Sequence, residues 1–290
     1  MPKLIECVPN FSEGSDPSLI DEIVSAVKSA KVLNVHSDPD HNRSVVTILG
    51  KPDEVILAAF SLTERAIQLL DIKQHVGEHP FIGVVDVIPL IPVKGISVAE
   101  TVVLARELAS ELWTKIKLPV FYYGDAAIIP SRRDLPNVRR GGYFALRQEI
   151  GTPARHPDVG SGLHATAGAV AIGVRDYLIA FNINLDSNDL SIASSIAKNI
   201  REKSGGLPGV RAIGIDLKSR GIVQVSINII DHKATSLKAV FDEVSKWAKE
   251  YQVGILESEL VGMLPQSALF AEMKNYLKLS NYSDQLILPF

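Results

Sequence analysis

The sequence predicts an α/β (α+β) protein of two ferredoxin-like subdomains, each with the element order βαββαβ. Two observations lead to this fold class. The order strand, helix, strand, strand, helix, strand occurs twice, over residues 4–91 and again over residues 177–256. The first strand of each half also ends in an asparagine-bearing turn, Val8-Pro9-Asn10-Phe11 and Phe181-Asn182-Ile183-Asn184. We expect subdomains 1–165 and 166–290, with a ligand cleft between them.

In the first half, short β-branched runs alternate with amphipathic helices. Strands are expected at residues 4–8, 31–35, 44–49, 84–91 and 120–123. Asp16-Pro17 supplies an N-cap and a proline at the first helical position, which predicts a helix from there. Further helices are expected over residues 52–70 and after the capping box Ser97-Val98-Ala99-Glu100. Residues 132–164 show little periodicity and many Pro, Gly and Arg residues, which indicates a long loop or linker.

The second half begins with a predicted hairpin of strands 169–174 and 177–183, turned at Arg175-Asp176. A helix follows, with apolar residues on one face at Leu190, Ala193, Ile196, Ala197 and Ile200. Strands are then expected at 210–217 and 222–229, a helix at 237–247 and a final strand at 253–256.

Composition narrows the class of protein. The chain has 290 residues, 46% hydrophobic and 22% charged, which are values for a globular protein with a real core. Thirty basic and 33 acidic residues give a net charge of −3, so we expect no nucleic-acid or membrane partner. Arg132-Arg133 and Arg139-Arg140 are interpreted as solvated surface, with a local anion site left open.

The sequence also indicates where the protein works. The N-terminus has no secretory signal pattern, and no apolar stretch approaches the ~20 residues needed to span a bilayer. The single cysteine, Cys7, lies in an apolar strand-like run, so we expect a buried thiol. We therefore expect a cytoplasmic protein.

A histidine stands at the entrance of the central predicted strand. His79 follows Glu78, and Asp86 lies within the apolar run. Imidazole has an ordinary pKa near ~6.5, so His79 could serve as a general base, with a capping histidine as the alternative. His75 and His79 have the spacing of a helical zinc pair, but Gly77 and Pro80 argue against a helix there, and no metal is predicted.

Two further polar clusters stand beside predicted strands. The segment from Asp38 to Arg43 gathers carboxylates, an imidazole, an amide and a guanidinium, although turn preferences also explain Asp, Asn and Pro there. The segment 158–169 is rich in Gly and small residues, which lets a ligand approach backbone amides closely. A flexible linker is the alternative interpretation of the second cluster.

At this point the sequence resembles a known family. The matching stretches are Glu6-Cys7-Val8-Pro9-Asn10-Phe11-Ser12-Glu13-Gly14, Asp38-Pro39-Asp40-His41-Asn42-Arg43, Gly77-Glu78-His79-Pro80, Asp86-Val87-Ile88-Pro89, Leu178-Ile179-Ala180-Phe181-Asn182-Ile183-Asn184-Leu185 and Ser258-Glu259-Leu260-Val261-Gly262. In this order they span nearly the whole chain and closely resemble the formiminotransferase family, a module found alone or fused to a cyclodeaminase. Because the sequence stops at Phe290, we expect no cyclodeaminase module.

The resemblance implies a folate-dependent reaction of one-carbon metabolism and histidine degradation. Tetrahydrofolate would bind between the subdomains and receive at N5 the formimino group of N-formimino-L-glutamate, and the protein would be a homodimer. The catalytic histidine of the family falls on His79. Its folate-binding segment falls on Gly160, Ser161, Gly162, Leu163, His164, Ala165, Thr166, Ala167 and Gly168.

The physical chemistry of the reaction suggests roles for other matching residues. His79 would take the proton of N5, and Glu78, Asp86 or Asp38 would orient the imidazole or stabilise the cationic formimino group. Arg43 would clamp a substrate carboxylate. The supporting candidates are Asn10, Asp38, His41, Asn42, Arg43, Glu78 and Asp86.

Two positions depart from the family pattern. Many relatives have an arginine where this chain has Phe81, and a proline where it has Ser161. The loss of a carboxylate contact at Phe81 keeps another donor open, formiminoglycine or 5-formyltetrahydrofolate. A non-catalytic folate-binding module is the alternative of a different class.

Overall fold

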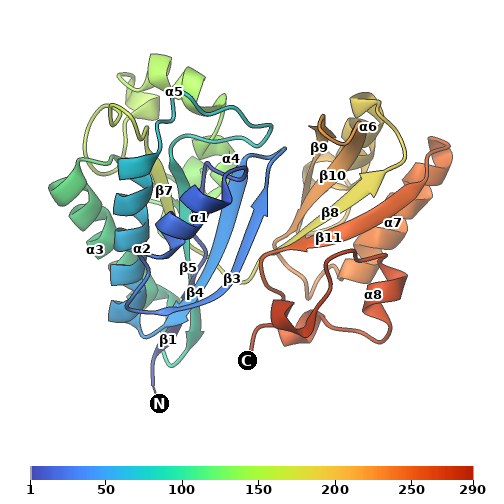
Figure 1. Ribbon diagram of the computed structural model, residues 1–290, viewed down its shortest axis with the longest axis horizontal. Helices are drawn as coiled ribbons and strands as arrows, with labels where there is room; N and C mark the ends of the chain where they lie inside the picture. Colours follow the sequence, from blue (N-terminus) through green and yellow to red (C-terminus); the bar gives the residue numbers. More distant parts are fainter. Residues whose placement is uncertain (1, 290) are drawn as a thin grey trace. The chain divides into compact units, whose positions relative to one another are not determined.

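The computed structural model describes residues 2–289, and the chain divides after Asp176 into two compact units (Figure 1). Each unit has its own sheet and its own hydrophobic core. The division lies later than the expected boundary after residue 165. The reason is that β7 (Val170–Val174) pairs with strands of the first unit.

The first sheet contains the predicted βαββαβ arrangement, extended by two parallel strands. Besides β7, its strands are β1 (Leu4–Cys7), β2 (Asn10–Phe11), β3 (Lys31–Asp38), β4 (Arg43–Gly50), β5 (Val85–Lys94) and β6 (Val120–Gly124). Both β1 and β2 pair antiparallel with β4 on one side and β5 on the other, and β3 pairs with β4. In the βαββαβ motif the first strand is β1 with β2, and β3, β4 and β5 are the second, third and fourth. The fourth strand of the motif lies beside the first and the third lies beside the second, which is the ferredoxin-like order. The extension consists of β7 and β6. β7 lies between β5 and β6 and runs parallel to both.

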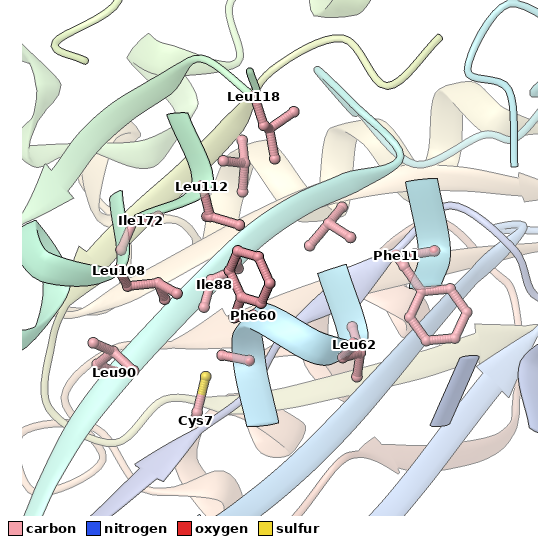
Figure 2. Packing of buried hydrophobic residues seen from close by; sticks show 14 of the residues in the cluster. Cys7, Phe11, Phe60, Leu62, Ile88, Leu90, Leu108, Leu112, Leu118 and Ile172 are labelled. Carbon is pink, nitrogen blue, oxygen red and sulfur yellow. The ribbon is translucent and has the colours of Figure 1, made fainter. Parts of the chain in front are cut away.

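Three amphipathic helices, α1 (Pro17–Val24), α2 (Pro52–Leu69) and α3 (Val98–Ile116), pack on this sheet and bury its main core. The predicted caps form: Asp16 accepts hydrogen bonds from the first turn of α1, and Ser97 closes the capping box of α3. Figure 2 shows Ile88 and Leu90 of β5 packed in this core, together with Cys7 of β1. Cys7 is buried as predicted, and burial raises the pKa of its thiol, which leaves it unreactive at neutral pH.

Short helices pack on the face of β5, β7 and β6 that is opposite the main core. They are α4 (Leu135–Val138), α5 (Gly142–Glu149) and the 3-10 turns Pro130–Arg133 and Pro153–Arg155. Val138 and Leu146 pack against Phe121 and Tyr123 of β6 in a separate small core. The expectation of a loop or linker over residues 132–164 was therefore wrong. Elements of four to eight residues carry too few apolar positions for a helical period to stand out among Pro and Gly.

The second unit repeats the arrangement without an extension. Its strands are β8 (Ile179–Leu185), β9 (Val210–Leu217), β10 (Ile222–Ile229) and β11 (Ile255–Val261), in the antiparallel order β11-β8-β10-β9. The connecting helices α6 (Leu190–Ile200) and α7 (Leu237–Glu250) pack their apolar faces into one core. The short helix α8 (Met273–Tyr276) and the 3-10 turns Glu202–Ser204, Gln266–Ala268 and Asp284–Leu286 complete the unit. The second predicted βαββαβ unit is thus confirmed. Its last strand, β11, begins at Ile255, two residues later than expected.

The predicted hairpin of residues 169–174 and 177–183 does not form, because β7 and β8 belong to different sheets. Every residue of β7 is buried, which is typical of a strand inside a parallel sheet. Two apolar runs with a short polar connection resemble a hairpin locally, and only the long-range pairing distinguishes the two arrangements. Within the described part of the chain, none of the helices has the length and apolar character that crossing a bilayer requires.

Candidate active site

The turn between β3 and β4 is hydrogen-bonded to two neighbouring loops of the first unit, at Gly14 and at Val76. Asp38 closes the turn by accepting a hydrogen bond from the backbone N–H of His41 at 2.7 Å. The Asn42 amide reaches outward: its Oδ1 accepts from the Gly14 N–H at 2.9 Å, and its Nδ2 donates to the Val76 carbonyl at 2.8 Å. Asn42 therefore fixes the loop that carries His79, and Asp38 stabilises the turn. Both side chains form hydrogen bonds with backbone groups.

A buried cluster of three charged groups joins β4, β5 and the end of α4, with Arg43 on β4, Asp86 on β5 and Arg139 at the end of α4. Arg43 Nη1 donates to Asp86 Oδ2 at 2.9 Å, and Arg139 Nη2 donates to the same oxygen. The other oxygen of Asp86 accepts from the Ile82 N–H at 3.0 Å. Arg43 Nε and Nη2 both donate to Asn10 Oδ1, at 2.9 and 2.5 Å. The sequence placed Asn10, Arg43 and Asp86 in the site, and the fold brings them together.

The imidazole of His79 lies beside this cluster. Its Nδ1 is 2.8 Å from the Pro80 carbonyl oxygen and 2.9 Å from Arg43 Nη1. A carbonyl only accepts and a guanidinium only donates, so these neighbours favour opposite tautomers. With the proton on Nδ1, the ring donates to Pro80 and Nε2 carries the free lone pair.

The electrostatic surroundings keep His79 neutral. Desolvation lowers its pKa well below the ordinary 6.5, and the positive charges of Arg43 and Arg139 lower it further. Burial and the neighbouring Arg139 also lower the pKa of Arg43, to about 10, so Arg43 stays charged at neutral pH. His79 is consequently a neutral imidazole at neutral pH.

The group that orients His79 differs from the candidates taken from the sequence. The hydrogen-bond neighbours of Nδ1 are a backbone carbonyl and a guanidinium, and neither is a carboxylate. Asp38 is engaged in its own turn, Glu78 is exposed, and Asp86 reaches His79 only through Arg43. Each nitrogen of Arg43 faces a protein group, Asn10, Asp86 or His79, and its expected role as a clamp for a substrate carboxylate stays a prediction.

Aromatic side chains follow His79 in the chain and lie beside His75, beginning with Phe81. The Phe81 ring contacts the His75 ring edge-on, with centroids 4.5 Å apart, and stacks on Tyr143 of α5 at 6.5 Å. Phe144, the next residue of α5, is 62% exposed. This side of the candidate site is therefore apolar.

The candidate folate segment, residues 160–168, lies beside the strand that follows His79. Val84 N–H donates to the Ala167 carbonyl at 2.9 Å, and Ala169 N–H donates to the Ile82 carbonyl at 3.1 Å. These bonds align the end of the segment with the start of β5. The sequence-based expectation that His79 and this segment belong to one region is consistent with the pairing.

Within this segment, some residues shape the loop and others are accessible. His164 Nδ1 accepts from the backbone N–H of Ala167 at 3.0 Å, so His164 has a structural role, and burial lowers its pKa. Gly160 has φ +86°, and a Cβ there would lie 2.4 Å from the ring of Trp113. Ser161, Gly162 and Ala165 are exposed. Backbone amides of the exposed part are therefore open to a ligand.

Two arginines that sequence reasoning assigned to the solvated surface pair with buried carboxylates. Arg139 is held by Asp86, and Arg132 pairs with the buried carboxylate of Asp158 at 2.9 Å. Asp158 also accepts from the Tyr122 N–H at 2.8 Å, which ties the start of the 158–169 segment to β6. The available signal was the carboxylate itself, because an aspartate within apolar surroundings requires a cationic partner.

Metal-ligating side chains do not gather within residues 2–289: no group of three or more His, Cys, Asp or Glu residues could hold an ion. His75 Nδ1 lies 3.4 Å from the Asn42 amide, and His79 Nδ1 faces Pro80 and Arg43.

Comparison with known proteins agrees with the two-unit architecture. A model of the formiminotransferase domain, N-terminal subdomain, matches residues 4–175, and a model of the formiminotransferase domain matches residues 180–286. The chain belongs to the formiminotransferase family. The interval between the two matches coincides with the division after Asp176.

Relatives in the formiminotransferase family align over nearly the whole chain. Glutamate formimidoyltransferase of Streptococcus pyogenes serotype M1 is 37% identical over 286 residues, 97% of this chain and 96% of the relative. Glutamate formimidoyltransferase of Thermoplasma acidophilum is 38% identical over 290 residues, 98% and 96% of the two chains. Formimidoyltransferase-cyclodeaminase of Rattus norvegicus is 40% identical over 279 residues, which is 93% of this chain and 51% of the relative. This chain thus spans about half of that longer protein.

Proposed function

We propose that this chain transfers the formimino group of N-formimino-L-glutamate to N5 of tetrahydrofolate, giving 5-formiminotetrahydrofolate and glutamate. The observation that carries the proposal is the similarity, along both whole chains, to two proteins named glutamate formimidoyltransferase. The neutral histidine beside two arginines supports it, because the reaction needs a base and takes an anionic donor.

The base in this reaction is His79. N5 attacks the amidine carbon of the donor, and a bond from N5 to carbon forms while the N5 proton passes to Nε2 of the imidazole. The tetrahedral intermediate then collapses, the bond from carbon to the glutamate nitrogen breaks, and the proton moves from the imidazolium to the departing amine. The Pro80 carbonyl, 2.8 Å from Nδ1, holds the tautomer that leaves Nε2 free for the first step.

Arg43 and Arg139 tune this exchange. Their charges favour the neutral imidazole, so His79 is ready to accept a proton at neutral pH. The same charges make the imidazolium a stronger acid, which speeds the return of the proton to the leaving amine. The lowered pKa also makes the neutral imidazole of His79 a weaker base. A base of moderate strength suits a group that must both take and release one proton.

Folate recognition belongs to the segment 160–168 in this proposal. Its exposed glycine-rich portion offers backbone amides to the polar edge of the pterin, and its pairing with the start of β5 keeps it near the loop of His79. A homodimeric state and a cytoplasmic location complete the proposal, the first on the family resemblance and the second on the sequence.

The test is turnover. The protein is incubated with formiminoglutamate and tetrahydrofolate, the mixture is acidified, and the methenyltetrahydrofolate formed from the product is measured by its absorbance. We expect product that depends on both substrates. Formiminoglycine and 5-formyltetrahydrofolate are assayed in parallel as donors. A folded protein that gives no product above the blank with formiminoglutamate contradicts the proposal, and product only with another donor corrects the substrate.

A further inference from the structure

The charges of the cluster beside His79 do not balance. Asp86 is one carboxylate with 1% of its side chain exposed, and it faces two guanidinium groups, of Arg43 and Arg139, that are 12% and 13% exposed. Burial of a charge is unfavourable unless a partner compensates it. The cluster thus carries one positive charge more than its own carboxylate offsets.

The neighbouring titratable groups do not supply the missing negative charge. The pKa of Arg43 is influenced by Arg139, Asp86 and Tyr123. Burial raises the pKa of Tyr123, so its phenol is neutral. The pKa of His79 is influenced by the two arginines and by the imidazole of His41. Asp86 is the one carboxylate among these neighbours, and an anion from outside the chain would complete the set.

The two arginines differ in their free donors. Arg43 directs all three of its nitrogens at Asn10, Asp86 and His79. Arg139 gives a hydrogen bond to Asp86 through Nη2, while its Nε is buried without a hydrogen-bond partner in the described part of the chain. The guanidinium of Arg139 is consequently fixed by Asp86 and keeps donor capacity for a ligand.

The chemistry of the substrates indicates which anion arrives here. In formiminoglutamate the α-carboxylate is one carbon away from the nitrogen that leaves, so it always lies close to the reacting carbon. The carboxylates of folate are at the far end of that molecule, beyond the aminobenzoyl group. A carboxylate beside the base His79 is therefore that of the donor.

We infer that Arg139 binds the α-carboxylate of the formimino donor next to His79, with Asp86 holding the guanidinium in place. This inference rests on the proposed function and assigns to Arg139 the contact that the sequence had suggested for Arg43. It also explains how the site can bind an amino-acid donor although Phe81 offers no cation. Any donor with an α-carboxylate, formiminoglycine included, would use the same contact.

The experiment compares three donors on three proteins. The donors are formiminoglutamate, N-formimino-4-aminobutyrate, which lacks the α-carboxylate, and N-formimino-2-aminobutyrate, which lacks the γ-carboxylate. The proteins are the wild type, Arg139→Met and the control Arg140→Met, whose side chain is 69% exposed and pairs with Glu149 at 3.6 Å. KM for tetrahydrofolate is measured in each protein.

For the wild type we expect loss of the α-carboxylate to lower kcat/KM by about 10- to 100-fold, the range for a hydrogen bond to a charged group. Arg139→Met should show a similar loss with formiminoglutamate and no further loss with the donor that lacks the α-carboxylate. Its KM for tetrahydrofolate should stay within about twofold of the wild type, and Arg140→Met should behave as the wild type. If Arg139→Met lowers turnover of both donors equally, or raises KM for tetrahydrofolate alone, the inference is wrong.

Two further measurements decide the matter if Arg139→Met does not fold or no donor is turned over. Arg139→Lys keeps the charge and should lose part of the α-carboxylate preference. Calorimetry with the wild type should detect binding of glutamate and much weaker binding of 4-aminobutyrate, whether or not turnover occurs. Equal affinities for these two ligands overturn the inference, whereas absence of turnover with normal glutamate binding contradicts only the proposed function.

Discussion

At the scale of single residues, the site is a set of side chains held by one another. Arg43 donates to Asp86 and Asn10, and the Pro80 carbonyl oxygen lies 2.8 Å from Nδ1 of His79. In the proposed reaction Nε2 of the imidazole takes the proton. A histidine in positive surroundings is neutral at lower pH than usual, and this property is measurable.

The acid limb of the rate profile should lie below the ordinary histidine range. The base form of His79 is neutral, its pKa is lowered well below 6.5, and activity falls only when pH drops through that lowered pKa. We expect kcat/KM to stay level from pH 7 to below 6.5 and then to decline. His232→Gln, in the second unit, serves as the control and should leave the profile unchanged. A limb with its midpoint at or above 6.5 would show that the arginines do not act on the base.

Sequence reasoning found most of these residues, but it could not assign their contacts. Motif resemblance selected His79, Arg43 and Asp86, and the fold brings them together. The orienting carbonyl of Pro80 carries no side-chain signature, so no residue type could reveal it. Arg139 was missed because its partner Asp86 lies 53 positions earlier in the chain, and such a pairing depends on tertiary structure.

At the scale of elements, two loops position the site. The turn from Asp38 to Arg43 binds the loop that precedes β5, and the 158–169 segment pairs with the start of β5. Close backbone approach explains glycines in these regions: a Cβ at Gly77 would lie 2.6 Å from the His41 carbonyl oxygen of the turn, and a Cβ at Gly168 would lie 2.5 Å from the Ile82 carbonyl oxygen. Gly160 is the clearest case, because a Cβ there would lie 2.4 Å from the ring of Trp113 on α3.

A pair of glycine substitutions separates this contact from backbone strain. Gly160→Ala and Gly162→Ala both place alanine at positive φ, +86° and +65°, which costs about 1–2 kcal/mol in each case. A Cβ at Gly162 meets nothing within 4 Å, whereas at Gly160 it collides with Trp113. Urea unfolding should show a larger loss of stability for Gly160→Ala, together with weaker folate binding. Equal losses in the two variants would mean that packing on Trp113 does not shape the loop.

Elements with strong local signals were predictable. Asp16-Pro17 and the Ser97 capping box gave the starts of α1 and α3, and alternation or long apolar runs gave the strands. The short helices α4 and α5 were not predictable, because they are stabilised by packing on β6 and not by their own periodicity. The false hairpin at residues 169–183 has the same origin: neighbours in the sequence looked like partners, while the true partners of β7 are β5 and β6.

At the scale of the whole molecule, the chain consists of two ferredoxin-like units with separate cores. The candidate residues, from Asn10 to Gly168, all belong to the first unit. The repeated βαββαβ order was visible in the sequence, but the parallel extension β6–β7 was not. Without it the boundary was placed before β7, although β7 completes the first sheet.

A fragment of residues 1–176 should fold by itself. It contains a complete sheet, its covering helices and a core of its own. We expect a cooperative urea transition, followed by circular dichroism, for the purified fragment. A shorter fragment, 1–165, lacks β7 and should be much less stable. Absence of a cooperative transition in fragment 1–176 would mean that the first unit is not an independent folding unit.

The central claim is that His79 moves the proton during formimino transfer, and replacing it tests this claim most directly. His79→Ala is compared with the wild type in the assay with formiminoglutamate and tetrahydrofolate, and folate affinity is measured separately. Removal of a general base should lower kcat by about 10²- to 10⁴-fold, while the affinity for tetrahydrofolate changes little. A variant that folds, binds folate and retains the kcat of the wild type would contradict the role of His79.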